Sequence, residues 1–208
     1  MGVQVRSILA ENITIVYDRL DLHAVDASKL KALTETHAVI MDTPELIVAV
    51  FPASPLIVQL GDRRVRITHQ GEHEALGALP LWEIAAKCHQ AVPQECKVVA
   101  YGYNYDVLAS TGDVAASDAL KMAFLRDQQA FEEAAGGTLR SFAPRFVYDQ
   151  DAVCDLTLEP HDANRIKVHM NVHFTADSLP ATGQLQESYF ARFERLVAVL
   201  QRLLKGGD

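Results

Sequence analysis

The chain has 208 residues, of which 49% are hydrophobic and 22% charged, a balance that is typical of a folded globular protein and excludes disordered and fibrous classes. The formal net charge is −8 and the basic residues are scattered, so the basic patch carried by nucleic-acid binders is missing. We therefore expect one acidic domain over residues 1–208 that does not bind nucleic acid.

The cysteines and the opening segment indicate an intracellular protein. Cys88, Cys96 and Cys154 form no C-x-x-C pair, so the sequence predicts neither a disulfide framework nor a zinc knuckle. Glu11 interrupts the opening segment before an apolar run suited to a secretory signal can form. No apolar run reaches the roughly 18 residues that span a bilayer. These features predict a cytoplasmic protein with no membrane anchor and no cofactor.

The first half of the chain predicts strands and helices in a regular order. A β-branched and aromatic segment at residues 12–18 predicts a strand, and a helix is expected at residues 27–37 after Asp26, a suitable N-cap. Three strands and a helix follow, at residues 46–51, 56–60, 64–68 and 81–92.

The second half predicts a similar order. A strand at residues 97–107 leads through a connection at 108–116 to a helix at 118–135, which Gly136 and Gly137 end. Three strands and a final helix follow, at residues 139–148, 152–158, 165–174 and 184–205. In the final helix Phe190, Phe193, Val197 and Leu204 widen the apolar stripe beyond what one face requires.

The two halves predict the same element order, α-β-β-β-α. We expect an α+β fold in which a mostly antiparallel sheet has helices on one face, with an internal duplication over pseudo-repeats 12–107 and 117–205. Coincidence is the alternative, because amphipathic hairpins resemble one another by construction.

The strand at residues 165–174 alternates between an apolar and a polar face. A symmetric hairpin would place Asp155 opposite His169 on the polar face, and a carboxylate beside an imidazole can make it a general acid or base. We therefore name Asp155 and His169 as candidate catalytic residues, with Asn171 and His173 on the same face as candidate ligand-binding residues. The alternative is a solvated face with ordinary cross-strand charge pairs.

Metal binding is not predicted, because neither of the two closely spaced histidine pairs suggests a strong metal site. His169 and His173 lie four residues apart on a strand, about 13 Å, so they cannot share a zinc ion. His69 and His73 fall in a predicted loop, where a weak site with Glu72 or Glu74 is conceivable but a polar loop is the simpler interpretation.

Three tyrosines, Tyr101, Tyr103 and Tyr105, lie on one face of the strand at residues 97–107. Rings with polar tips suit a ligand-binding wall or a partner surface, so these residues are candidate ligand contacts. Tyrosine is equally favoured in the core of a sheet, which is the alternative.

No dinucleotide, Walker, hydrolase or zincin motif occurs in the chain. The first functional hypothesis is a non-catalytic binding or assembly domain that self-associates or binds a protein partner through strand edges or the apolar final helix. The second is a small-ligand binder or enzyme that uses a cleft between the two halves, with Asp155 and His169 as an acid/base pair.

Overall fold

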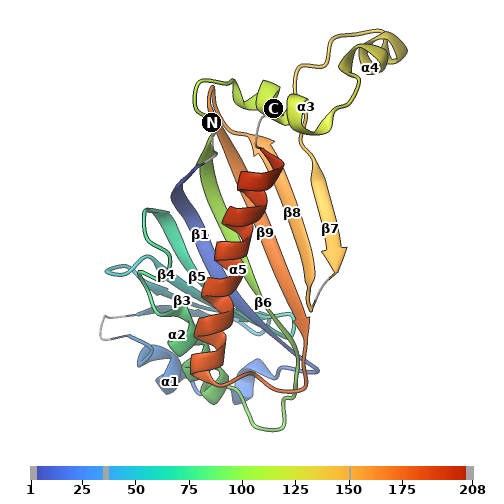
Figure 1. Cartoon of the computed structure of the whole chain (residues 1–208). Helices are drawn as coiled ribbons and strands as arrows, with labels where there is room; N and C mark the ends of the chain where they lie inside the picture. Colours follow the sequence, from blue (N-terminus) through green and yellow to red (C-terminus); the bar gives the residue numbers. More distant parts are fainter. Residues whose placement is uncertain (1–3, 35–37, 150, 205–208) are drawn as a thin grey trace.

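A computed structural model describes residues 4–34, 38–149 and 151–204 of the chain. In these ranges nine strands form one sheet in the order β2-β3-β4-β5-β1-β6-β9-β8-β7, and all neighbouring strands run antiparallel (Figure 1). The prediction of a mixed α+β fold with an antiparallel sheet is confirmed.

The strands differ greatly in length, and the longest occupy the middle of the sheet. Their bounds are β1 (Gln4–Tyr17), β2 (Val39–Asp42), β3 (Ile47–Phe51), β4 (Leu56–Gly61), β5 (Arg64–His73), β6 (Val98–Ser110), β7 (Arg145–Asp149), β8 (Val153–Pro160) and β9 (Arg165–Thr175). The central pair of strands is β1 and β6, and the order outward from it is similar on both sides. On one side β5, β4 and β3 follow β1, and on the other β9, β8 and β7 follow β6.

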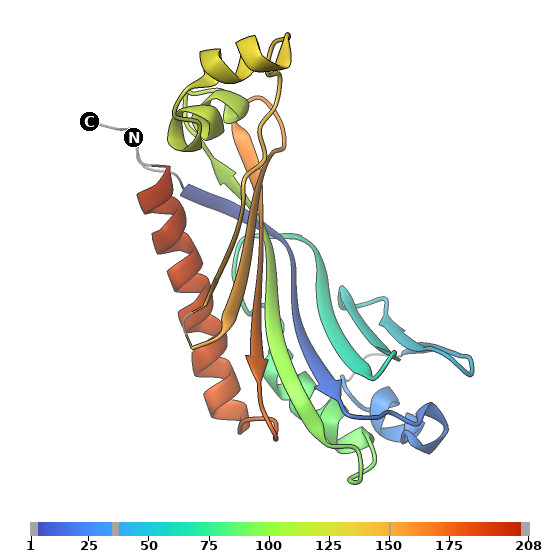
Figure 2. The ribbon, with the colours of Figure 1, turned by 90° about the vertical axis from the view of Figure 1, so that its right-hand side faces the viewer.

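Five α-helices accompany the sheet in the described ranges, and none of them is long and apolar enough to cross a bilayer. Their bounds are α1 (Ala27–Lys31), α2 (Leu81–Ala91), α3 (Ala116–Phe124), α4 (Gln128–Ala135) and α5 (Thr182–Leu203). Figure 1 shows α5 lying lengthwise across the central strands, and Figures 1 and 2 show α3 and α4 beyond the opposite end of the sheet from α1 and α2.

The core lies between the sheet and the helices α2 and α5. In β9 the side chains of Ile166, Val168, Met170 and Val172 are buried, and the residues between them are not, as the alternation predicted. The helices also contact each other, since the Trp82 ring of α2 lies against two aromatic rings of α5. All three cysteines are buried free thiols.

The wide apolar stripe of α5 is used inside the molecule. Phe190 packs against Trp82 and Phe193 against Tyr105, and both phenylalanines are partly buried on the core. The stripe predicted a partner surface on this helix, but these two rings are held by the protein's own sheet and by α2.

One predicted helix is two helices in the structure. Residues 118–135 were expected to be continuous, but α3 ends at Phe124 and α4 begins at Gln128. Asp127 causes the break, because its carboxylate accepts a hydrogen bond from the Ala130 backbone N–H and caps α4 instead of continuing α3. Phe131 of α4 is 51% exposed.

Several strand boundaries also differ from the prediction. Strand β5 continues to His73, so His69 and His73 lie in a strand and not in a loop. A register shift between β1 and β5 at Gly71, whose φ is +109°, accommodates the polar residues that suggested a loop. The short edge strand β2 was not predicted. The helix expected at 27–37 is shorter in the structure, because α1 ends at Lys31 and residues 32–34 are not helical, while residues 35–37 lie outside the described residues.

Candidate functional site

The sheet face opposite α5 carries the polar side chains of the central strands and contains a hollow of about 380 Å³. Five strands line it, β1, β5, β6, β8 and β9, so it extends across the middle of the sheet. Its volume lies at the lower end of the range for small-molecule pockets, roughly 300–1,000 Å³. This face is therefore the first candidate for a functional site.

His169 is the histidine of this face that forms a hydrogen bond with a carboxylate. Its Nδ1 lies 2.8 Å from Asp106 Oδ1, and its imidazole is 43% exposed, so it is both paired and accessible. The hydrogen bond to Asp106 raises the pKa of His169 above its ordinary value, against the opposing effect of partial burial. The contact with Asp106 thus stabilises the imidazolium form of His169.

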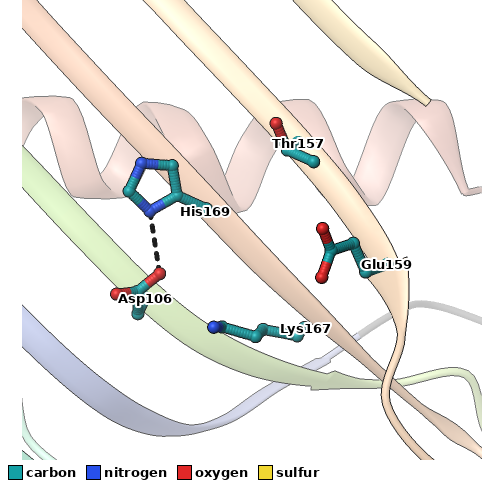
Figure 3. A pocket seen from close by; sticks show the side chains of 5 residues that line it. All are labelled: Asp106, Thr157, Glu159, Lys167 and His169. Atoms are coloured by element: carbon teal, nitrogen blue, oxygen red, sulfur yellow. Dashed lines mark hydrogen bonds and ion pairs between the residues drawn. The ribbon is translucent and has the colours of Figure 1, made fainter. Parts of the chain in front are cut away.

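A smaller adjoining hollow of about 300 Å³ surrounds the same pair (Figure 3). Thr157 and Glu159 of β8 and Lys167 of β9 complete its lining, on the side of the sheet away from α5. Polar groups of both charges therefore gather within one shallow region around His169.

The predicted partner of His169 was wrong by two residues. Asp155 pairs with Asn171, and Thr157 lies opposite His169. The turn shifts the register, because the Asp162 carboxylate accepts hydrogen bonds from the Arg165 backbone N–H and from its guanidinium, which holds Arg165 in the turn.

Asp155 is engaged by a different residue. It forms a bidentate pair with Arg145 of β7, at 2.9 Å and 2.5 Å, and these hydrogen bonds lower the pKa of its carboxyl group. Asp155 still borders the central hollow together with His169, Asn171 and His173, so the structure brings these four predicted residues to one face.

The three predicted tyrosines are packed on the other face. The hydroxyls of Tyr103 and Tyr105 donate hydrogen bonds to the α5 carbonyls of Leu185 and Tyr189, and burial raises the pKa of both phenols. Tyr101 borders the central hollow, but its ring stacks on Phe174. The structure therefore separates the tyrosine rings from the histidines of the polar face.

Two arginines complete the polar face and were not singled out in the sequence. Arg64 and Arg66 of β5 line the central hollow, and neither forms an ion pair with any of the described residues. Glu45 and Asp62 border the same arginines from a neighbouring hollow without pairing with them. The alternation of β5 could have predicted this placement, because Val65 and Ile67 point into the core.

A second group of ionisable residues is buried on the helix-covered face. Glu11 is fully buried, and its Oε1 atom lies 3.0 Å from His69 Nδ1 and 3.6 Å from His73 Nε2. The other carboxylate oxygen accepts a 2.6 Å hydrogen bond from the Tyr189 hydroxyl. Burial, and next the Glu11 charge, raise the pKa of Tyr189. Among the described residues, Glu11, His69 and His73 form a group that could hold a metal ion.

Sequence reasoning missed Glu11 and Asp106, although each left a signal. Glu11 occupies an apolar position in the alternation of β1, in phase with Ile13 and Ile15, and a charge at a core position marks a special site. Asp106 follows Asn104 on the polar side of β6.

Comparison with known proteins gives no further guidance. No protein-family model matches the chain, and no curated protein sequence matches it. The function must therefore be inferred from the geometry of these two groups.

Proposed function

We propose that the protein binds a small anionic ligand, carrying a carboxylate or phosphate group, on the polar face of its sheet. The observation that carries this proposal is the pair of arginines in the central hollow, Arg64 and Arg66, which have no ion-pair partner among described residues. Arginine donates planar, charge-assisted hydrogen bonds that match carboxylate and phosphate oxygens.

The neighbouring groups support an anion in the same place. The one carboxylate that lines this hollow belongs to Asp155, and Arg145 neutralises it. His169 and His173 supply further imidazole N–H donors from β9. The hollow is thus locally positive on a chain whose formal net charge is −8.

The proposal is tested by titrating the full chain with inorganic phosphate and, separately, succinate. Binding is followed through the imidazole proton resonances of His169 and His173 in NMR spectra. We expect saturable shifts, and at least tenfold weaker binding in the Arg64→Gln/Arg66→Gln double variant.

Arg202→Gln serves as the control, because it removes a positive charge from exposed α5 surface remote from the hollow. Shifts that sodium chloride reproduces at equal ionic strength, or that persist unchanged in the double variant, would contradict the proposal.

A second candidate function is catalysis on the bound anion, with His169 as general acid. The contact between His169 and Asp106 at 2.8 Å favours this candidate, since Asp106 takes the role that the sequence suggested for Asp155. Hydrolysis of p-nitrophenyl phosphate would test it. We expect turnover that His169→Gln abolishes and His161→Gln preserves; no turnover by the unaltered protein would remove this candidate.

We also propose that two copies of the chain assemble through the edge strand β2. Val39 and Met41 of β2 are 52% and 56% exposed, and among the described strands β2 has a hydrogen-bonding neighbour only on its β3 side. Light scattering coupled to size-exclusion chromatography should give a dimer that Met41→Glu dissociates. A monomer from micromolar to millimolar concentration would refute this assembly.

Internal duplication is our proposal for the origin of the sheet. The outward order of strands from β1 and from β6 supports it, as does the helix that follows β5 and β9 in turn. Units of 4–92 and 98–203 suit this order better than 12–107 and 117–205, because each then begins with a central strand.

A cytoplasmic location is likewise proposed, supported by three free thiols.

A further inference from the structure

The buried group of Glu11, His69 and His73 places three ligand atoms around one point. Oε1 of Glu11 lies 3.0 Å from His69 Nδ1 and 3.6 Å from His73 Nε2, and all three atoms lie within 4.8 Å of one another. Two ligands of a tetrahedral zinc ion, each about 2.1 Å from the metal, are roughly 3.4 Å apart. The two shorter separations bracket that value, so an ion fits with side-chain adjustments alone.

The position of one proton makes the point between these atoms attractive to a cation. His73 Nδ1 lies 2.7 Å from the Gly71 carbonyl oxygen, which can only accept, so Nδ1 carries the hydrogen. Nε2 of a neutral His73 then presents a lone pair, and this buried atom has no hydrogen-bond partner among described residues. It faces the Glu11 carboxylate, and a cation placed between the two would remove their repulsion.

Hydrogen bonds to neighbouring groups hold His73 and Glu11 in the orientation that metal-binding side chains usually have. The bond from His73 to the Gly71 carbonyl fixes its tautomer, a usual arrangement for a metal-binding histidine. Oε2 of Glu11 accepts hydrogen bonds from the Tyr189 hydroxyl at 2.6 Å and the Gly77 N–H at 3.4 Å, which leaves Oε1 to the imidazoles.

The loop beside the group is shaped to reach the carboxylate. Gly77 has a φ of +73°, and a Cβ atom there would come within 2.8 Å of the Phe190 ring. Only glycine therefore suits the backbone position that donates to Glu11. The group is connected in this way to β1, β5, α5 and the loop before α2.

We propose that Glu11, His69 and His73 bind a divalent transition-metal ion of the zinc class, with water as the fourth ligand. Two imidazoles and one carboxylate suit zinc and disfavour magnesium and calcium, which prefer oxygen ligands. For His69 Nδ1 to coordinate the ion, any hydrogen between it and Glu11 must leave this nitrogen, either to solvent or to Nε2 of the same ring. The ion would then join side chains of β1 and β5 beneath α5.

The test uses the full chain, stripped of metal by EDTA and titrated with zinc chloride against a chromophoric chelator. We expect one equivalent of zinc to bind with a Kd below about 1 µM and to raise the melting temperature. His73→Gln should weaken binding at least 100-fold. His161→Gln, a change of the same kind at an exposed turn, should bind as the unaltered chain does.

A spectroscopic measurement on the unaltered protein keeps the test independent of variant folding. Cobalt(II) bound by two nitrogens and two oxygens in four-coordinate geometry gives visible d–d absorption, which we expect after one equivalent and which zinc should abolish. No stoichiometric zinc binding, or undiminished binding by a folded His73→Gln variant, would overturn the proposal and leave a His69 ion pair with Glu11. Zinc binding should be unaffected by the Arg64→Gln/Arg66→Gln double variant, so the two proposals can fail separately.

Discussion

The two faces of the sheet each hold a histidine beside a carboxylate, at nearly equal distances. His69 lies 3.0 Å from Glu11 on the helix-covered face, and His169 lies 2.8 Å from Asp106 on the open face. Their surroundings differ: Glu11 is fully buried, whereas the His169 imidazole is 43% exposed. Distance alone therefore does not distinguish them, and solvent access decides how much free energy each contact controls.

The largest difference between the faces should appear when each carboxylate is removed. Glu11→Ala leaves the buried His69 imidazole and the Tyr189 hydroxyl without their acceptor, and we expect a loss of about 3–5 kcal/mol in the free energy of unfolding. Asp106→Ala should cost less than about 1 kcal/mol, because water replaces the lost partner. Urea unfolding in the presence of EDTA measures both, and equal losses would contradict the comparison.

A single hydroxyl sharpens the buried side of the comparison. Tyr189→Phe removes the 2.6 Å hydrogen bond to the buried carboxylate, and we expect a loss of about 1.5–3 kcal/mol. Tyr103→Phe removes a 3.3 Å bond to a neutral carbonyl in the same layer, and should cost about 0.5–1.5 kcal/mol. Chemical denaturation of both variants would show whether the charge of the acceptor makes the difference.

The open face is also expected to tolerate little change where β6 and β9 approach closely. A Cβ atom at Gly102 would lie 2.4 Å from the Val172 carbonyl oxygen, so Gly102→Ala should cost about 1–3 kcal/mol. Gly137→Ala is the matched control, because no atom lies within 4 Å of the added methyl group. Thermal unfolding of the two variants should differ clearly, and equal melting temperatures would refute the close approach.

The smallest effect concerns pH and the exposed pair. The pKa of His169 is raised in the folded state, so its stabilising contribution is complete below about pH 6.5 and is lost as the pH rises through the folded-state pKa. Asp106→Asn should lower that pKa, as measured by NMR titration of the imidazole. The accompanying loss of stability should stay below about 1 kcal/mol at pH 5.5 and become smaller as the pH rises through the folded-state pKa of His169.

Strands such as β4, β6 and β9 were accessible from the sequence because their inward faces are apolar, whereas the exposed edge strand β2 was not. The alternation at residues 165–174 predicted β9 and its inward side correctly. The register of its hairpin was not accessible, since side-chain hydrogen bonds of Asp162 in the turn set it. The break between α3 and α4 depends in the same way on one capping aspartate, Asp127.

The candidate sites were harder to predict because they join strands distant in the sequence. His169 was named from its own strand, but its partner Asp106 lies 63 positions away and meets it only through the pairing of β6 with β9. The link between Glu11 and Tyr189 spans 178 positions. Neither pairing follows from local periodicity, which reports the face of a side chain but not its neighbour across the sheet.

The position of α5 at the end of the element order has a consequence for biosynthesis. Strands β1 and β6 leave the ribosome long before α5, whose side chains cover their apolar face. At roughly 5–20 residues per second, the segment between β6 and the end of α5 takes about 5–20 seconds to translate. During that interval the apolar face of the nascent sheet, which includes Glu11, is not yet covered by α5. A chaperone that shields apolar surfaces should therefore raise the yield of native protein.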